Sequence, residues 1–251
     1  MSVSVLPVPG LPMIGRGDDL VRLLGDAIEG AGIALQPADI VAVCQKVVSK
    51  AEGATVRLAD VDPSPFARTV AAQSEGKDPR AVEVVLREAK RIVRMDRGHL
   101  IVETAHGWVC ANAGVDASNG VAADVLTLLP RDPDASAAQI REGLQARFAV
   151  ELAVVVTDTF GRPWREGLVD VALGCAGMAP LLDFRGRQDL HGRELRHTVV
   201  AIADAVAAAA GLVMAKDAGI AAAIVRGVVY ARAAGGAAAA LVRHPEFDLF
   251  R

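Results

Sequence analysis

The stretch Leu152-Ala-Val-Val-Val-Thr-Asp-Thr159 passes from continuous apolar residues into polar ones. An apolar run of this length, Leu152 to Val156, predicts a buried strand. Similar runs predict a short buried strand at Ile40–Cys44 and a final strand at Ala221–Val225. Polar residues follow each of these strands, and loops at such positions commonly carry function. The search for a site therefore begins at these strand ends.

Weaker patterns predict the remaining elements. Apolar residues at helical spacing predict four helices, at residues 18–31, around residues 82–93, from a capping-box pattern at 136–139 onward, and at 198–214. Further strands are expected at residues 2–8 and 169–173, and a hairpin is expected from 100–104 and 108–112. Residues 46–53 are expected to form a polar turn region, and residues 54–79 surface structure with a short helix.

The order of these elements favours an α+β fold with two subdomains. Strands and helices interleave irregularly, and neither a repeat nor a regular βαβ rhythm is present. We therefore expect one functional domain over residues 1–251, divided into two subdomains, rather than a doubly wound sheet. A boundary is expected near Pro130–Asp134, although no linker composition marks it.

Composition excludes several classes of protein. Hydrophobic residues make up 52% of the 251 residues, so the chain can bury a core and is not disordered. A net charge of -3 argues against nucleic acid as the main partner. The N-terminus lacks a basic signal-peptide region, and the apolar run at 196–216 contains Asp204, so neither a leader nor a membrane span is expected. Three scattered cysteines are typical of free thiols in the cytoplasm: Cys44, Cys110 and Cys175.

Common nucleotide and metal motifs are missing from the sequence. Gly76-Lys77 lacks the upstream glycine of a Walker A loop, and Gly15-Arg-Gly17 is not completed to a dinucleotide-binding fingerprint. Neither an HExxH motif nor a paired-cysteine zinc motif occurs. A bound nucleotide would therefore be held without either phosphate-cradling signature.

The first candidate site is Thr157–Gly167, the densest polar stretch of the chain. Asp158 follows an apolar strand, and a carboxylate there suits a hard cation such as Mg²⁺ or Mn²⁺, to which Thr159 would add a hydroxyl oxygen. Arg162 and Arg165 are suited to hold phosphate or carboxylate groups. A capped turn with solvated arginines explains the same spacing equally well.

Two further stretches follow other strands. In Asn112–Asn119, small residues accompany Asp116 and allow close backbone approach and oxygen ligation, although an Asx turn would explain them too. Asp116 and Asp158 would hold one metal if their strand ends converge. In Cys44–Gly53, Lys46 and Lys50 are candidate phosphate contacts, against the more common alternative of solvated lysines.

Taken together, these stretches resemble the coenzyme F420-0:L-glutamate ligases, which are the γ-glutamyl ligases of the deazaflavin cofactor. The matching segments occur in family order over nearly the whole chain, and each would be weak alone. They are residues 10–14 with 17–20, 45–53, 111–119, 128–136, 157–167, and 212–216 with 225–227.

The resemblance implies a GTP-dependent amide ligase. GTP would phosphorylate the lactyl carboxylate of F420-0, and the amine of L-glutamate would displace phosphate and give the amide. Later cycles would add γ-linked glutamates. It also implies an α+β fold with mixed and antiparallel sheets, packed helices and an intertwined homodimer. GTP, L-glutamate and F420-0 are the expected partners, with no nucleic acid and no membrane.

The resemblance also assigns roles to residues. Asp116 and Asp158 would ligate one divalent ion and Thr159 a second, either Mg²⁺ or Mn²⁺, with K⁺ as an additional candidate ion. Together with Arg162 and Arg165, the two aspartates form the expected catalytic set. The expected GTP contacts are Leu11, Pro12, Met13, Ile14, Gln45, Lys50, Asn119, Met214 and Lys216.

The chain departs from the family pattern at three points. Gln45 stands where many members have serine, and Ala215-Lys216 stands where archaeal members often have glycine and a metal-binding side chain. We also expect no C-terminal nitroreductase-like domain, which bacterial relatives often carry. Two alternatives stay open: a related ligase acting on a different carboxylate acceptor, and a non-catalytic subunit that binds a nucleotide or a deazaflavin.

Overall fold

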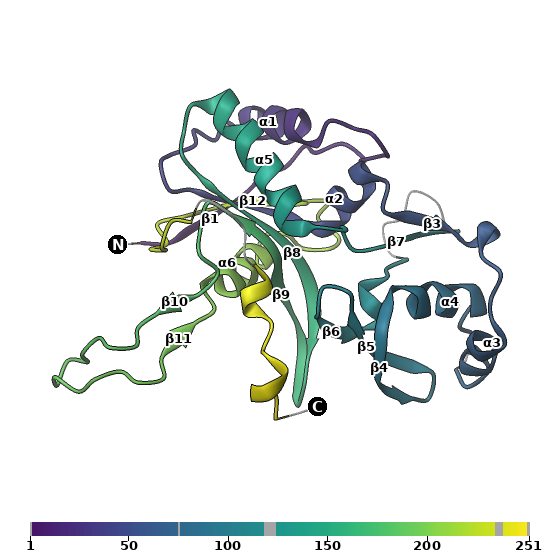
Figure 1. Ribbon diagram of the computed structural model, residues 1–251. Coiled ribbons are helices and arrows are strands. Elements are labelled where there is room, and N and C mark those ends of the chain that lie inside the picture. Colours follow the sequence, from purple (N-terminus) through teal and green to yellow (C-terminus); the bar gives the residue numbers. More distant parts are fainter. Residues whose placement is uncertain (1, 75, 118–123, 234–237, 250–251) are drawn as a thin grey trace.

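A five-stranded sheet organises the main lobe of the protein (Figure 1). The computed structural model describes residues 2–74, 76–117, 124–233 and 238–249. The pairing of β2 with β8 is parallel, and the other three pairings are antiparallel. The strands run in the order β1 (Ser4–Pro7), β12 (Ala222–Arg226), β2 (Ile40–Cys44), β8 (Ala153–Arg162) and β9 (Arg165–Ala176).

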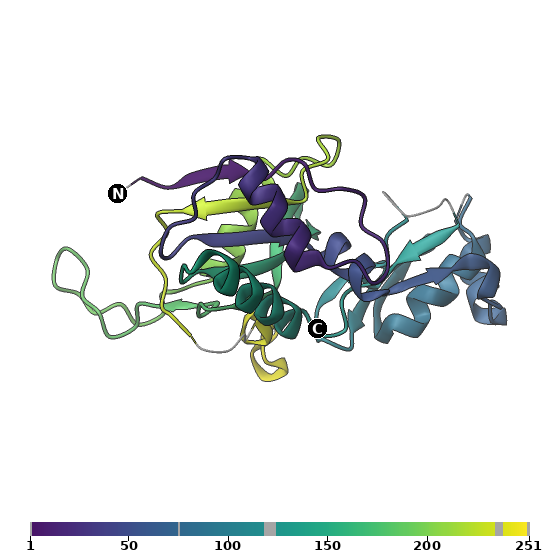
Figure 2. The same ribbon diagram turned by 90° about the horizontal axis from the view of Figure 1, so that it is seen from above.

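Helices cover both faces of this sheet (Figures 1 and 2). Successive strand residues point to opposite faces. Val41 and Val154 therefore pack with α1 (Leu20–Gly30) and α5 (Pro133–Phe148). Their neighbours Ile40 and Ala153 pack on the other face with α6 (Ile202–Gly211). A continuous apolar run replaces strict alternation in β2 and β8 because both faces of these strands are buried.

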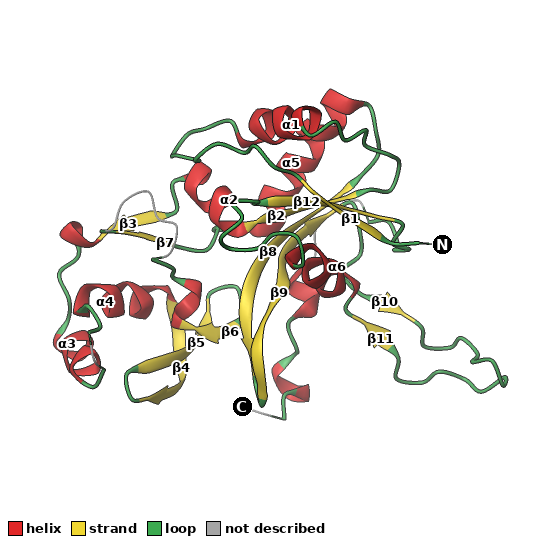
Figure 3. Ribbon diagram, turned by 180° about the vertical axis from the view of Figure 1, so that it is seen from behind, coloured by secondary structure: helices red, strands yellow, loops and turns green. Residues whose placement is uncertain are grey.

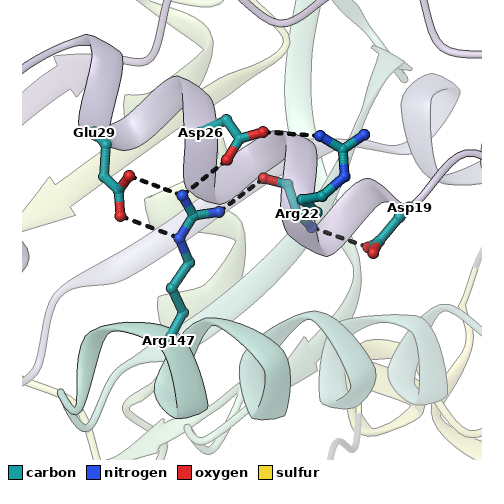
Figure 4. A network of polar contacts seen from close by, with 5 residues as sticks. All are labelled: Asp19, Arg22, Asp26, Glu29 and Arg147. Carbon is teal, nitrogen blue, oxygen red and sulfur yellow. Dashed lines mark hydrogen bonds and ion pairs between the residues drawn. The ribbon is translucent and has the colours of Figure 1, made fainter.

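Arg147 ties the two helices of one face together (Figure 4). Its guanidinium, on α5, donates to Asp26 and Glu29 of α1 at 2.8 Å each and to the carbonyl of Arg22 at 3.0 Å. A Cβ at position 25 would overlap this guanidinium, so Gly25 leaves the room that it occupies. This contact fixes α5 over α1, and the strand β8 follows shortly after α5.

A smaller lobe is formed by residues 55–127, and it has hydrophobic cores of its own. Leu100 and Val102 pack there against the helices α3 and α4. The chain enters this lobe after α2 (Gln45–Glu52) and leaves it after Thr127, before α5 begins at Pro133. Its elements are β3 (Thr55–Arg57), α3 (Pro65–Ala72), α4 (Pro79–Glu88), β4 (Ala89–Asp96), β5 (His99–Thr104), β6 (Val109–Ala111) and β7 (Val125–Thr127), with 3-10 turns at Leu58–Asp60 and Asn112–Gly114.

Two hairpins extend away from the main sheet (Figure 3). The first is formed by the distal halves of β8 and β9. The second carries the short strands β10 (Leu182–Asp183) and β11 (Val199–Val200) at its base. Two 3-10 turns, Ala238–Leu241 and Pro245–Phe247, follow near the C-terminus. In the described parts of the chain, no helix is long and apolar enough to cross a membrane.

The predicted mixture of packed helices with mixed and antiparallel sheets is confirmed. The hairpin of β5 and β6 is confirmed as well. On α4, Glu83 and Arg87 form an ion pair one helical turn apart, at 3.2 Å. The segment 46–53, expected to be a polar turn, is instead the helix α2. It begins directly after β2 and ends at Gly53, whose φ of 74° closes the helix in the left-handed region.

Three element boundaries also differ from the prediction. The helical pattern at 82–93 ends at Glu88, because the residues from Ala89 onward pair with β5 as β4. Residues 199–200 are in β11, so α6 is shorter than the predicted helix. The helix α5 begins at Pro133 rather than at the capping-box pattern, because the side chain of Asp132 accepts from the amide of Ala135 and caps it.

Candidate functional site

A cavity of about 390 Å³ opens beside the end of β2 and the middle of β8. These two parallel strands are in register with Cys44 opposite Thr157, so the segments that follow them emerge side by side. The helix α2 follows β2, and the distal half of β8 continues with the predicted polar residues. The cavity is lined by residues 11–14, 44, 46–47 and 50, 157–159, 170, 214–217 and 219–221.

Asp158 lies in this cavity as a half-buried carboxylate. The pKa of Asp158 is raised to about 6, chiefly by burial and to a lesser degree by the negative charges of Asp116 and Asp170. The amide of Thr159 and the ammonium of Lys46 act in the opposite direction. A cation that binds beside this carboxyl group would stabilise its ionised form, because the positive charge offsets the cost of burying a charge and the repulsion from the neighbouring carboxylates.

Asp116 comes to the site from the smaller lobe. Its backbone exchanges hydrogen bonds with Thr127 at 3.0 and 2.9 Å, which fixes the position of the residue beside β7. Its side chain forms a 2.6 Å ion pair with Lys46, the first polar residue of α2 to reach the cavity. The charge of Lys46 also lowers the pKa of Asp158, so both carboxylates interact electrostatically with one ammonium group.

Thr159 and Asp170 face each other across the β8–β9 hairpin. They are direct partners in the register of the two strands, and the Thr159 hydroxyl donates to Oδ1 of Asp170 at 2.6 Å. Both side chains line the cavity. Thr159 belongs to the predicted set of site residues, whereas Asp170 does not.

Lys50 and Gln45 lie on α2. Lys50 lines the cavity, and burial together with the charge of Lys46 lowers its pKa. Gln45 is fully buried behind the cavity wall, where its Oε1 accepts from the Ser49 hydroxyl at 2.9 Å. Within the described residues, Nε2 of Gln45 has no hydrogen-bond partner. Asn119, the remaining residue predicted for this part of the site, lies outside the described residues.

Two loops complete the walls. Leu11, Pro12, Met13 and Ile14 form one of them, with Ile14 buried and Met13 exposed. The other contains Met214 and Lys216, together with Asp217, which is not in the predicted set. The predicted nucleotide contacts that the structure describes, apart from Gln45, therefore line a single cavity.

Arg162 and Arg165 lie elsewhere. They pair with each other at the tip of the β8–β9 hairpin, beside the exposed Trp164, and neither lines the cavity. The Arg162 guanidinium donates to the carbonyls of Gly167 and Glu166 in its own hairpin.

The donor set of the cavity suits a hard divalent cation. Among the described residues, no three acidic, histidine or cysteine side chains are grouped closely enough to hold a metal by themselves. Mg²⁺ is usually bound through one or two carboxylates, with phosphate oxygens and waters completing the octahedron. Asp158 and Thr159 line the cavity, and Asp116 is paired with Lys46 of the cavity wall. Together they would offer two carboxylates and a hydroxyl for that arrangement.

Lys46 and Asp170 are the functional candidates missing from the predicted set. Lys46 belonged to a predicted phosphate-binding stretch, but on α2 it also pairs with Asp116. A signal for Asp170 exists in the sequence. A tight turn at Pro163-Trp164 places residue 159 opposite residue 170, allowing for the irregular pairing next to the turn.

The family model for F420-0:gamma-glutamyl ligase matches residues 10–227 of the chain. The chain belongs to this family. Its members include relatives called coenzyme F420:L-glutamate ligase, and the chain is similar to them over its whole length. The protein of Methanothermobacter thermautotrophicus is 45% identical over 253 residues, covering 100% of both chains.

Two further relatives with the same name support this membership. The Methanopyrus kandleri protein is 46% identical, covering 100% of this chain and 98% of its own. The Archaeoglobus fulgidus protein is 40% identical, covering 100% and 97%. The segment matched by the family model includes every residue that lines the cavity.

Proposed function

We infer that this chain is a coenzyme F420:L-glutamate ligase, and we propose that it uses GTP to attach L-glutamate to F420-0. The inference of ligase activity rests on the full-length similarity to ligases of that name. The observation that carries the site assignment is the cavity, in which a basic helix start, a half-buried carboxylate and two loops meet. These features together suit the binding of a triphosphate and a cation.

The proposed reaction has two steps. A carboxylate oxygen of F420-0 attacks the γ-phosphorus of GTP, so GDP leaves and an acyl phosphate forms. The amine of L-glutamate then attacks the acyl carbon, loses a proton and expels phosphate, which leaves the amide. Repetition at the new γ-carboxylate adds further glutamates. Neither step requires a side chain of the protein as the nucleophile.

The residues of the cavity have distinct tasks in this scheme. Lys46 and Lys50 would contact phosphate oxygens, and Leu11–Ile14 would contact the base. Asp116 and Asp158 would hold one divalent ion and Thr159 a second. These ions supply charge that screens the triphosphate and the leaving GDP. The enclosed walls would limit the access of water, which otherwise hydrolyses an acyl phosphate.

Mass spectrometry of the deazaflavin tests this function. After incubation with GTP, Mn²⁺ and L-glutamate, F420-0 is expected to gain one glutamate residue for each GDP released. A reaction without GTP and one without glutamate serve as controls. Unchanged F420-0 in the complete reaction would contradict the proposal and would favour a different acceptor or a binding subunit.

We expect GTP to be preferred over ATP. The loop Leu11–Ile14 lines the cavity next to Gly10, and hydrogen bonds from its backbone would distinguish the base edges of guanine and adenine. One or two hydrogen bonds to the base correspond to a preference of roughly tenfold or more in kcat/KM. Steady-state kinetics with each nucleotide measure this ratio. Equal values of kcat/KM would show that this loop does not select the base.

We further propose that Arg162 or Arg165 binds the phosphodiester or a carboxylate of the acceptor, or the glutamate. Loss of a charged hydrogen bond costs about 1.5–3 kcal/mol, so Arg162→Ala or Arg165→Ala should raise the KM of one substrate roughly tenfold or more. Arg68→Ala, in the smaller lobe, is the control for the removal of an exposed arginine. Unchanged KM values in both hairpin variants would show that neither arginine binds a substrate.

We propose a homodimer as the working form and the cytoplasm as its location. Exposed apolar side chains on both extended hairpins support the dimer: Trp164 and Leu168 on one, and Leu190 on the other. The free state of Cys44, Cys110 and Cys175 supports a reducing compartment.

A further inference from the structure

We propose that Asp170 is a positioning residue of this site, which holds the Thr159 hydroxyl so that its oxygen lone pairs face the cavity. The proposal rests on the proposed function, because it concerns the cation for which Thr159 is a candidate ligand. It adds a residue to that site and a reason for the orientation of Thr159.

The hydrogen bond between these two residues decides how the hydroxyl is oriented. A hydroxyl group has one proton to donate and two lone pairs to offer. The Thr159 hydroxyl donates its proton to Oδ1 of Asp170 at 2.6 Å, a length typical of a bond to an ionised carboxylate. Once the proton points at Asp170, the lone pairs remain for a cation. A hydroxyl without this acceptor would be free to turn its proton into the cavity and repel the cation.

The position of Asp170 is itself determined by the fold. The residue lies directly opposite Thr159 in the hairpin, and the end of α6 packs against its side chain. A Cβ added at Gly211 would lie 2.7 Å from Oδ2 of Asp170, so the glycine leaves just enough room for the carboxylate. This packing restricts the movement of the carboxylate away from Thr159. Groups that hold a metal ligand in this way commonly change metal affinity 10- to 100-fold when removed.

A purely structural reading assigns the pair to cross-strand stabilisation of the hairpin, which is worth about 0.2–1 kcal/mol. The two readings differ in what they predict for cation affinity. If Asp170 acts through Thr159, its replacement should weaken cation binding strongly when the hydroxyl is present and much less when it is absent. A structural pair should change the unfolding temperature and leave cation affinity unaltered.

The experiment is a double-mutant cycle on the full-length protein, with Mn²⁺ as the probe. Mn²⁺ binding is measured by electron paramagnetic resonance in saturating GDP, for the wild type, Asp170→Asn, Thr159→Val and the double variant. We expect Asp170→Asn to weaken binding roughly 10- to 100-fold in the wild type and far less in the Thr159→Val background. Thr159→Ser, which keeps a hydroxyl, should retain most of the affinity.

Asp204→Asn is the matched control. Asp204, like Asp170, is a carboxylate hydrogen-bonded to the β8–β9 hairpin, since it accepts from the amide of Ala172 at 2.9 Å, but it does not line the cavity. Its replacement should leave Mn²⁺ affinity unchanged.

Two results would overturn the proposal. One is wild-type Mn²⁺ affinity in Asp170→Asn, and the other is an equal fold loss in both backgrounds, which would mean that Asp170 acts without Thr159. A wild-type protein that binds GDP but no Mn²⁺ would instead refute the cation site of the proposed function, and the proposal with it. Product formation, measured separately, shows whether the ligase activity stands in that case.

Discussion

Asp116→Asn and Asp158→Asn are each expected to abolish most ligase turnover, by at least about a hundredfold in kcat. Asparagine keeps the shape of the side chain but removes the negative charge that would offset a divalent cation. Asp116 would also lose its 2.6 Å ion pair with Lys46. Steady-state kinetics at limiting Mn²⁺, with GTP, F420-0 and L-glutamate saturating and GDP release as the signal, measure the loss.

The double variant tests whether the two aspartates act as a unit. If they hold one cation, Asp116→Asn should add little to the loss caused by Asp158→Asn, because effects within one functional unit do not add. Losses that multiply would show that the residues do not share a cation. Asp62→Asn, at a fully exposed carboxylate of the smaller lobe, should behave like the wild type. Full activity of either single variant would remove that residue from the site.

The second large effect is expected from Gly174→Ala, and it concerns stability. Gly174 lies in β9 at the irregularity where Val156 pairs with Gly174 but Thr157 pairs with Ala172. A Cβ at this position would overlap the backbone carbonyl of Pro133, at the start of α5. Backbone atoms cannot rotate away as a side chain can. We therefore expect a loss of about 3 kcal/mol or more in the free energy of unfolding.

Thermal unfolding measures this loss, which should lower Tm by roughly 6–12 °C for a chain of this length. Gly161→Ala is the matched control in the same hairpin. A Cβ there would meet nothing within 4 Å, and the backbone does not require a positive φ. A Gly174→Ala variant as stable as this control would mean that α5 can move away from the sheet at little cost.

The central strands were predictable because their composition alone marks them. Residues 40–44 and 152–156 are apolar without interruption, and burial on both faces explains the pattern. The helix at residues 45–52 was harder to predict, because Gln45 and the two lysines give the segment the composition of a polar loop. In the structure the helix buries most of these polar residues beside the cavity, which is a consequence of tertiary packing. The strand at residues 89–96 likewise depends on its pairing with β5.

The candidate site was predictable residue by residue but not as a geometry. Asp158 and Lys50 stand directly after the strand signals, and the family resemblance supplied the two loops. The pairing of Lys46 with Asp116 joins two lobes, and nothing in a single sequence gives such a contact. Asp170 required the register of a hairpin whose pairing is irregular next to its turn.

The order of strands in the main sheet has a consequence for folding during synthesis on the ribosome. The strand β12 lies between β1 and β2, although it is the last strand to be made. β2 likewise cannot pair with its parallel neighbour β8 until β8, which comes more than 100 residues later in the chain, has been synthesised. The smaller lobe, by contrast, is contiguous in the chain and has its own cores. It can therefore fold during synthesis, whereas the sheet that forms the cavity closes only when nearly the whole chain has emerged, at a high contact order that slows the step.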